Sequence, residues 1–488
     1  MTEMTEIPNI VLILADDMGY GDLSCLNEDS KIDTPHMDRI AAEGIIFTDA
    51  HASSSVCTPS RYSILTGRYS WRGKLQSGVL GPIEAALIDA QTFTLPQFLQ
   101  QSGYHTACIG KWHLGMGWPF RTPRSTAGLH WDGPEIIEAA NDIDYSQAIT
   151  DGPIDRGFDY FFGVDASNFP PYCFIENDHT LGIPTLQKPD EMFGHPGPMI
   201  EGWDLEELMP ELTRKAISYI NERAKEEQPF FLYFPSTAPH TPIAPIKKFQ
   251  GKSQAGAYGD FIIQLDDTIG QIYAALESCG FQDNTLLIVT SDNGSPGRYG
   301  SLEAPGSIIE TFGHKPNWIL RGLKADTWDG GHRVPCVAKW SNHIHRGSTC
   351  DELVCLMDLF ATFAAILGRE LPIDSAEDSF NILPYLLGEK LAEPIRRELV
   401  HQAYLRLFGI RKDEWKLIFS HRSGGLSPDP PTNNYDPPQQ LYNMQQDIRE
   451  RENLYFQYPE KVESLTNVFA EHQCRPTAPH TKNKTDHK

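Results

Sequence analysis

The chain has 488 residues, of which 40% are hydrophobic and 10% aromatic, and its formal net charge is -24. This length exceeds the usual limit of about 250–300 residues for one hydrophobic core, so we expect more than one packed unit. The negative charge argues against nonspecific nucleic-acid binding, and the absence of an apolar run of about 18 residues argues against a membrane span.

The N-terminal residues 1–6 are mostly polar and acidic, and they lack the basic and apolar regions of a signal peptide. We therefore expect a cytoplasmic protein, or a periplasmic or secreted one if an export signal has been removed. The nine cysteines are odd in number and scattered, which favours small buried side chains over a disulfide framework.

Short apolar runs alternate with helical patterns along the first part of the chain. Strands are predicted over residues 9–15, 104–109, 229–234 and 285–290, and helices over residues 34–43, 95–101, 205–223 and 259–278. This alternation favours an α/β fold with a large, mostly parallel mixed sheet sandwiched by helices. Ligand chemistry in such sheets gathers at the carboxyl ends of the strands.

Two later regions differ from this pattern. Residues from about 118 to 204 are irregular and rich in Pro, Gly and aromatic residues, so we expect them to form the rim of a substrate pocket. Strand-like stretches then follow at 399–407, 415–420 and 440–443, with a helix at 459–470. We predict a catalytic domain over 1–375, a small C-terminal α+β subdomain with a short antiparallel sheet over 376–473, and a disordered tail over 474–488.

Oxygen-bearing side chains follow two of the predicted strands. Asp16 and Asp17 follow the first, and Asp292 and Asn293 follow the strand at 285–290. An acidic pair alone is more often a helix cap or a solvated turn, but two such groups after buried strands favour a cation site. Carboxylate and amide oxygens suit Ca²⁺, with Mg²⁺ possible, and such an ion would activate an attacking oxygen.

Cationic and imidazole side chains follow the other strands. Lys111 and His113 are two residues apart, which places both on one face of an extended segment. His240 lies between two prolines, and Lys324 lies in a glycine-punctuated turn. Each of these signals is weak alone, because a structural histidine or a solvated lysine would give the same pattern.

The segment Cys57-Thr-Pro-Ser-Arg61 alone would be interpreted as a buried cysteine in a proline-broken loop. In this chain it is one of six motifs in order: NIVLILADDMGYGD (9–22), CTPSR (57–61), GKWHLG (110–115), PHTP (239–242), SDNG (291–294) and GLK with DGGHRVP (322–335). This series resembles the type I, formylglycine-dependent sulfatases of the alkaline phosphatase superfamily over about residues 8–340. Asp329 stands where many relatives carry glutamate.

The resemblance implies that a formylglycine-generating enzyme oxidises Cys57 to Cα-formylglycine. One hydroxyl of the hydrated aldehyde would attack sulfur, and loss of a proton from the other would expel sulfate. The metal ligands implied are residue 57 together with Asp16, Asp17, Asp292 and Asn293.

The other catalytic roles come from the same resemblance. Arg61 would hold the nucleophile, and Lys111 and Lys324 would bind sulfate oxygens. His240 would bind the ester or protonate the leaving oxygen, and His113 would accept the proton that drives elimination. Such a cationic cluster is what an anionic substrate needs in a chain of charge -24.

The sequence therefore predicts a sulfuric ester hydrolase, most simply one that acts exo on a sulfated carbohydrate. An aryl-sulfate or phosphonate/phosphate monoester hydrolase on the same scaffold and a non-catalytic sulfated-glycan binding protein stay open as alternatives. Neither nucleic acid nor a membrane is expected as a partner. Candidate sugar contacts, each more often structural, are Trp71, Arg72, Asp165, Asn168, Tyr172, Asp178, His179 and His314.

Overall fold

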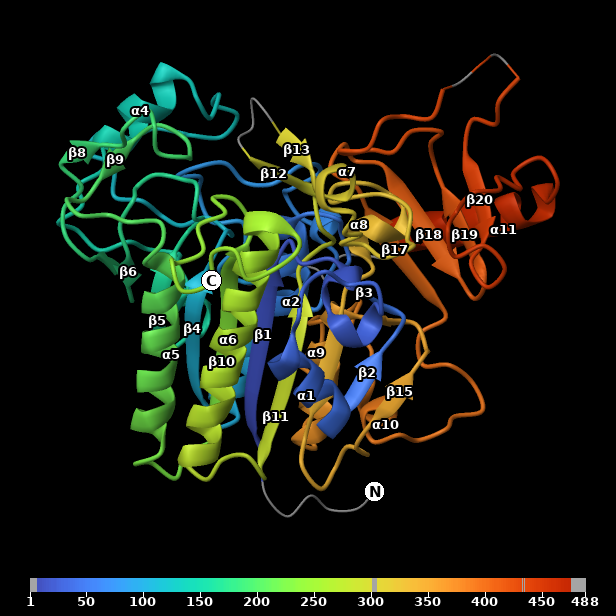
Figure 1. The fold of residues 1–488 in the computed structure, drawn as a ribbon, viewed down its shortest axis with the longest axis horizontal. Helices are drawn as coiled ribbons and strands as arrows, with labels where there is room; N and C mark the ends of the chain where they lie inside the picture. The colour runs from blue at the N-terminus through green and yellow to red at the C-terminus, as the bar shows by residue number, and fades with distance from the viewer. Residues whose placement is uncertain (1–6, 301–304, 432, 434, 475–488) are drawn as a thin grey trace, which may run out of the picture.

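The computed structural model describes residues 7–300, 305–431, 433 and 435–474, and its centre is a ten-stranded mixed sheet (Figure 1). The order across the sheet is β15 (Ser348–Cys350), β2 (Ile45–Phe47), β14 (Cys336–Lys339), β11 (Thr285–Ser291), β1 (Asn9–Asp16), β10 (Phe230–Pro239), β4 (His105–Lys111), β5 (Tyr160–Val164), β6 (Ile175–Glu176) and β7 (His179–Thr180).

The middle of this sheet is parallel, and its flanks contain antiparallel pairs, although β15 at one edge runs parallel to β2. Strands β11, β1, β10, β4 and β5 pair in parallel, whereas β14 runs antiparallel to both β11 and β2. On the other flank, β5, β6 and β7 pair antiparallel. The predicted mostly parallel mixed sheet is therefore confirmed.

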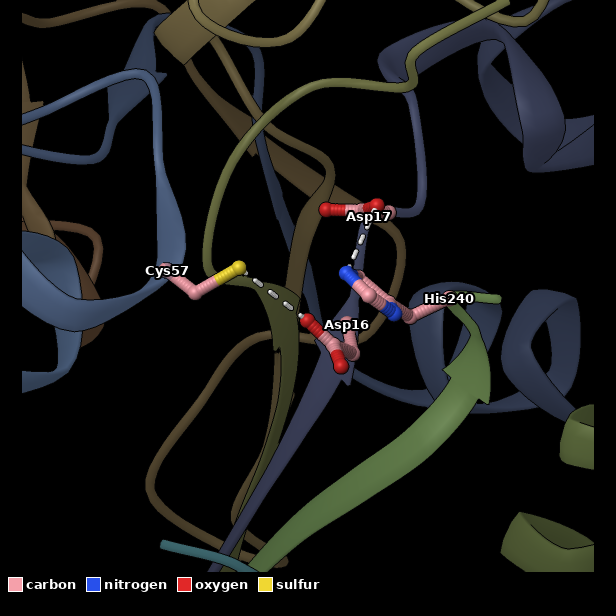
Figure 2. Close-up of side chains that lie close together, drawn as sticks. All are labelled: Asp16, Asp17, Cys57 and His240. Carbon is pink, nitrogen blue, oxygen red and sulfur yellow. Dashed lines mark hydrogen bonds and ion pairs between the residues drawn. The ribbon is translucent and has the colours of Figure 1, made fainter. Parts of the chain in front are cut away.

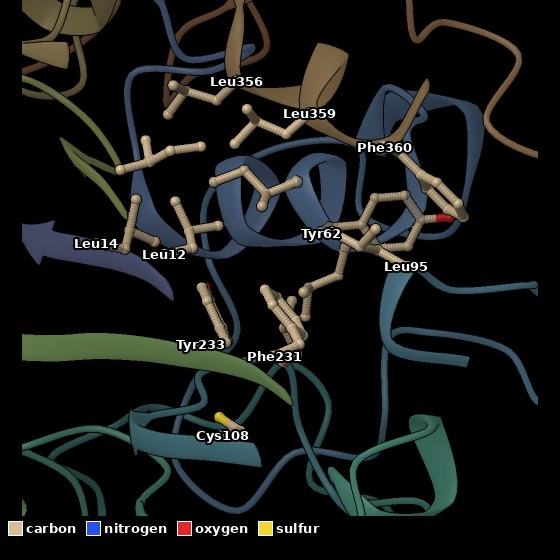
Figure 3. Packing of buried hydrophobic residues seen from close by; sticks show 14 of the residues in the cluster. Leu12, Leu14, Tyr62, Leu95, Cys108, Phe231, Tyr233, Leu356, Leu359 and Phe360 are labelled. Atoms are coloured by element: carbon tan, nitrogen blue, oxygen red, sulfur yellow. The ribbon is translucent and has the colours of Figure 1, made fainter. Parts of the chain in front are cut away.

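Helices cover both faces of the sheet because successive strand residues point to opposite sides. In β1, Val11 and Ile13 pack with residues of α1 (Pro35–Glu43), α5 (Leu208–Arg223) and α6 (Gly256–Ser278). Leu12 and Leu14 pack on the opposite face with residues of α2 (Cys57–Thr66), α3 (Leu95–Gln101) and α9 (Leu359–Ile366), as Figure 3 shows in part. Such two-sided burial explains why the central strands are continuous apolar runs.

A second, four-stranded antiparallel sheet is formed by the C-terminal part of the chain (Figure 1). Its strands are β17 (Glu398–Gln402), β18 (Phe408–Lys412), β19 (Trp415–Ile418) and β20 (Gln440–Asn443), and α11 (Pro459–Cys474) packs on it. Tyr69 and Met357 of the first part share its apolar cluster. The expected antiparallel C-terminal sheet is confirmed, and the domain boundary near residue 375 stays a prediction.

The remaining elements are short. They comprise β3 (Ala50–His51), β8 (Leu186–Gln187), β9 (Pro198–Met199), β12 (Arg298–Gly300), β13 (Pro305–Ser307), β16 (Val354–Cys355), α4 (Pro134–Asn141), α7 (Ile308–Phe312), α8 (Asp329–His332), α10 (Leu383–Leu386) and the 3₁₀ turns η1 (Tyr20–Asp22), η2 (Ser24–Leu26), η3 (Ser70–Arg72), η4 (Ile154–Arg156) and η5 (Leu356–Asp358).

Several features depart from the sequence prediction. Helix α2 and strands β2, β14, β15 and β18 were not expected, and the segment 118–204 contributes α4 and β5 to β9 instead of being wholly irregular. Cys474 closes α11, and the rest of the predicted disordered tail, 475–488, lies outside the described residues. No helix in the described ranges is long and apolar enough to cross a membrane.

Candidate active site

The polar side chains that follow the central strands meet at one edge of the sheet. Asp16 ends β1, Lys111 ends β4, His240 follows β10 and Asp292 follows β11. These strands are neighbours in the order β11, β1, β10, β4, and all four are parallel. Parallel pairing therefore gathers residues that are up to 276 positions apart in the chain, which is the difference between 16 and 292.

Cys57 is the first residue of α2 and faces this edge (Figure 2). Pro59 lies in the first turn of the helix, where the missing N–H breaks no intrahelical bond. The Cys57 Sγ lies 3.5 Å from Asp16 Oδ1 and 3.4 Å from Lys324 Nζ. Burial raises the pKa of the Cys57 thiol to about 12, although Lys111 and Lys324 oppose this shift. The unmodified side chain is therefore a protonated thiol at neutral pH.

Asp16 is buried between cationic side chains. Lys111 Nζ lies 2.7 Å from its Oδ2, and an Arg61 guanidinium nitrogen lies 3.3 Å from its Oδ1. Burial alone would raise the pKa of Asp16, but Lys111, then His240 and Arg61, outweigh it and hold that pKa well below its usual range. Asp16 is thus an ionised carboxylate.

Asp17 adopts a left-handed backbone conformation with φ of 72°, which turns the chain sharply at the end of β1. Its side chain accepts hydrogen bonds from Lys324 Nζ at 2.8 Å and from Asn293 Nδ2 at 2.7 Å. Its backbone N–H donates to Asp292 Oδ1 at 3.2 Å. Burial opposes charge on Lys324, but Asp17 outweighs this effect and raises the pKa of Lys324.

Arg61 connects the second acidic group to β4. Its Nε and one terminal nitrogen donate to Asp292 Oδ2 at 3.0 and 2.8 Å, and its other terminal nitrogen donates to the Lys111 carbonyl at 3.0 Å. Burial raises the pKa of Asp292 to about 6 against the pull of Arg61. A nearby divalent cation would favour the ionised form of this carboxylate.

The residues at this edge fit a hard divalent cation. The ligand atoms of Asp16, Asp17, Cys57 and His240 lie within 4.8 Å of one another. Asn293 Oδ1 is buried and has no hydrogen-bond partner among the described residues. Three carboxylates and a free amide oxygen are the donors that Ca²⁺ and Mg²⁺ prefer.

The two histidines are held in defined tautomers. His113 Nε2 donates to the Leu80 carbonyl at 3.0 Å, so its Nδ1 is the unprotonated nitrogen, and this atom finds no partner within the described chain. His240 Nδ1 donates to the Thr241 carbonyl at 2.6 Å, and its Nε2 lies 3.7 Å from Asp17 Oδ2.

Both imidazoles are neutral in this setting. Burial, then Lys111, lowers the pKa of His113 well below its usual value. Burial, then Lys111 and Lys324, lowers the pKa of His240 to about 4. Each ring can therefore accept a proton at its free nitrogen.

Comparison with known proteins identifies the family. The family model described as Sulfatase matches residues 8–369, about three quarters of the chain. The chain belongs to the sulfatase family. The expected enzyme class, sulfuric ester hydrolase, is thereby confirmed.

Individual relatives agree with this assignment. N-acetylgalactosamine-6-O-sulfatase of Bacteroides thetaiotaomicron is 33% identical over 95% of this chain and 92% of its own length. N-acetylgalactosamine-6-sulfatase of Homo sapiens is 31% identical over 96% and 85%. A solved structure from work on glycosaminoglycan metabolism by B. thetaiotaomicron superposes with a TM-score of 0.81 at 33% identity, covering 96% of this sulfatase and all of the other chain.

Among the rim residues predicted from the sequence, Asp165 lies next to His113 in this sulfatase. Its carbonyl accepts the His113 backbone N–H at 2.9 Å. Its side chain is buried, and Oδ1 has no partner in the part of the chain that the structure describes. Burial raises the pKa of Asp165 to about 7, against Lys111.

The other rim candidates make structural contacts. His314 is buried and bonds Asp22 at 2.7 Å, Arg72 bonds Asp378 at 2.7 Å, and Trp71 stacks on Tyr69. Tyr172 donates to the carbonyls of Asn168 and His195, and Asp178 and His179 pair with each other on the surface near β7. The role of these residues as sugar contacts stays a prediction.

One supporting residue was not found from the sequence. Asn317 is buried, and its Oδ1 accepts the Ser295 N–H at 2.9 Å while its Nδ2 donates to the Ser295 and Gly322 carbonyls. It therefore ties the SDNG loop to the turn that carries Lys324. A single asparagine between aromatic and apolar residues carries no sequence signal for this role.

Proposed function

We propose that this sulfatase hydrolyses a sulfate ester of a carbohydrate by exo cleavage, through formylglycine at position 57 and a bound Ca²⁺. The two relatives described above are named for the 6-sulfate of N-acetylgalactosamine, so this sugar is the first substrate to test. The observation that carries the proposal is the convergence of residue 57, two lysines and two imidazoles on one group of carboxylates.

Two groups would complete the site. Ca²⁺, or Mg²⁺ in its place, would be held by Asp16, Asp17, Asp292 and Asn293 and would supply Lewis-acid activation of the attacking oxygen. The hydrated aldehyde at position 57 would supply one hydroxyl to attack sulfur and a second whose deprotonation releases sulfate and restores the aldehyde.

The protein's own side chains then divide the work. Lys111 and Lys324 neutralise the non-bridging oxygens of the sulfate, where negative charge concentrates during the reaction. Lys324 is well placed, because its Nζ lies 3.4 Å from the Cys57 side chain and 2.8 Å from Asp17 Oδ2. Arg61 donates hydrogen bonds to Asp292 and to the Lys111 carbonyl at the end of β4, and so fixes the distance between Asp292 and Lys111.

The histidines are the proton carriers in this proposal. His113 Nδ1 is bare and buried, so it is the atom to accept the proton whose loss expels sulfate. His240 Nε2 lies 3.7 Å from Asp17 Oδ2 and is unprotonated, so it would first accept the proton released by the attacking hydroxyl and then pass that proton to the leaving alcohol.

The test combines mass spectrometry with a substrate panel. Protein coexpressed with a formylglycine-generating enzyme should show a loss of about 18 Da on the peptide that contains residue 57. It should then release sulfate from 6-sulfated N-acetylgalactosamine with a higher kcat/KM than from nitrophenyl sulfate. Higher efficiency on nitrophenyl phosphate would favour the phosphoryl alternative, and a thiol-only protein that binds but does not cleave sulfated sugars would favour the binding alternative.

A further inference from the structure

A cleft of about 450 Å³ lies beside the segment that follows His240. The end of the 118–204 region and the residues just after it form one wall with Met192, Trp203, Asp204 and Glu206. Ile243 and Gln250, which follow β10, also line the cleft. None of these residues has a role in the chemistry described above.

The cleft is within reach of the catalytic site. Ile243 is three residues beyond His240, and three residues of extended chain span at most about 11 Å. His240 Nε2 itself faces Asp17. A glycan whose sulfated ring occupies the catalytic site can therefore place a neighbouring ring in the cleft.

The lining chemistry is that of a sugar site. Trp203 is half-buried and packs against Phe174, with ring centroids 5.0 Å apart, so its indole is held in place by an aromatic neighbour. Ring faces bind the apolar C–H surface of a sugar, while carboxylates and amides accept or donate hydrogen bonds to its hydroxyls. Gln250 is oriented toward this wall, because its Nε2 donates to the Pro245 carbonyl at 2.9 Å and to Glu206 at 3.4 Å.

The charges in the cleft select for an uncharged ring. The ionisable residues among those that line it are Asp204 and Glu206, both acidic. A uronic acid or a second sulfated ring would be repelled there, whereas a neutral hexose would not. The candidate active site differs from the cleft, because Arg61, Lys111 and Lys324 lie among its carboxylates.

We propose that this cleft binds the neutral sugar ring next to the sulfated one, so that the enzyme prefers glycans in which the sulfated ring is joined to an uncharged neighbour. This inference rests on the proposed carbohydrate sulfatase function. It adds a binding site for a part of the substrate that takes no part in the reaction.

The first experiment uses the mature, metal-loaded enzyme and the variant Trp203→Ala. Three substrates are compared: 6-sulfated N-acetylgalactosamine, the same ring linked to a neutral hexose, and the same ring linked to a uronic acid. The variant should lower kcat/KM for the neutral disaccharide by about 3- to 10-fold, the effect of one aromatic contact, and leave the monosaccharide within about twofold. Phe456→Ala, which removes an exposed aromatic ring near α11, is the matched control and should change none of the three values.

The second variant, Asp204→Asn with Glu206→Gln, tests the charge argument and is independent of the folding of Trp203→Ala. It should raise kcat/KM for the uronic-acid disaccharide and leave the monosaccharide unchanged. Equal losses for monosaccharide and disaccharide in Trp203→Ala, or no change in the uronic-acid value in the charge variant, would overturn the proposal. If the parent enzyme cleaves the monosaccharide, such a result overturns only the proposal for the cleft. If the parent cleaves no sulfated sugar, the proposed function itself is wrong.

Discussion

Cys57 is poorly suited to act as a nucleophile while it is a thiol. Burial raises its pKa to about 12, and its Sγ is enclosed by Asp16 and Lys324. A cysteine needs a depressed pKa to be reactive, and the two lysines do not overcome the cost of burial here. The position is thus suited to a side chain that carries its own hydroxyl.

Replacement of Cys57 tests this conclusion. We expect Cys57→Ala to lower kcat/KM by at least about 1000-fold, because the covalent route is lost and only the surrounding charges remain. The melting temperature should change little, since only one sulfur atom leaves a site lined by polar groups. Cys25→Ser, at an exposed cysteine, should keep parental activity. Substantial turnover by Cys57→Ala would refute the nucleophile assignment.

Substitutions of Asn293 test metal binding separately from catalysis. Its free Oδ1 supports a role as a cation ligand, so Asn293→Leu should weaken Ca²⁺ binding to the chelator-stripped protein by at least about tenfold, measured by calorimetry. Asn293→Asp keeps an oxygen at this position and should retain binding. Equal losses in both variants would show that the Nδ2 hydrogen bond to Asp17, which both remove, is what matters.

Site residues could be predicted from the sequence where they end or follow a buried strand. Asp16, Lys111 and Asp292 end or follow apolar runs, and the parallel sheet brings such positions together. Rim residues lack that constraint. His314 has the residue type of a sugar contact, yet it is buried against Asp22, and composition alone cannot separate these two uses of a polar side chain.

At the scale of elements, α1 shows how a distant residue can set a helix end. Thr34, its N-cap residue, makes no capping hydrogen bond with its side chain. Asp266 of α6 instead accepts the backbone N–H groups of His36 and Met37 at 3.1 and 2.8 Å. Burial raises the pKa of Asp266 to about 6, although the two N–H groups and His36 oppose this and Asp38 adds to it.

This raised pKa predicts a pH dependence of stability. Because the folded-state pKa exceeds the ordinary value, the stabilising contribution is complete below about pH 4 and is lost as the pH rises through 6. Asp266→Asn cannot ionise, so its free energy of unfolding relative to the parent should rise between pH 4 and pH 7. Urea denaturation at both values measures this difference, and a difference that does not vary with pH would contradict it.

The helices and strands that could be predicted from the sequence are those whose own residues form a clear hydrophobic pattern. Strand β1 was expected over 9–15 and runs over Asn9–Asp16, because both of its faces are buried and every residue up to Ala15 after Asn9 is apolar. Strands β2 and β14 were missed because they are three and four residues long and owe their place to pairing with each other. Helix α2 was missed because Pro59 suggests a loop unless its place in the first turn is known.

At the scale of the whole molecule, a buried charge network joins the C-terminal sheet to the segment that follows Lys324. Lys416 of β19 is fully buried, and its Nζ lies 2.7 Å from Asp329 Oδ1 and 2.7 Å from Glu450 Oε1. Asp329 belongs to the segment that follows Lys324, and its N–H donates to Glu450 at 2.7 Å. The C-terminal sheet thereby supports a segment that reaches into the candidate active site.

Lys416 also sets the charge of its partners. Burial alone would raise the pKa of Asp329, but Lys416, followed by His51, holds it well below the usual range. The pKa of Glu450 is raised to about 7 by burial, against Lys416. One ammonium group thus contacts two buried carboxyl groups. Its removal takes away the cation 2.7 Å from Glu450 and leaves Asp329 with Arg333, whose nearer contact to it is 3.5 Å.

Lys416→Met preserves much of the side-chain length and removes the charge. Because loss of one partner of a buried ion pair leaves an uncompensated charge, we expect the free energy of unfolding to fall by about 3–5 kcal/mol.

Lys412→Met is the control: Lys412 is partly exposed and lies 3.5 Å from Glu398 in the same sheet, so its loss should cost less than about 1 kcal/mol. Adding Glu450→Gln to Lys416→Met should recover part of the loss, since one buried acid becomes neutral. Chemical denaturation of the four proteins measures these values, and a Lys416→Met variant as stable as Lys412→Met would show that the network does not stabilise the fold.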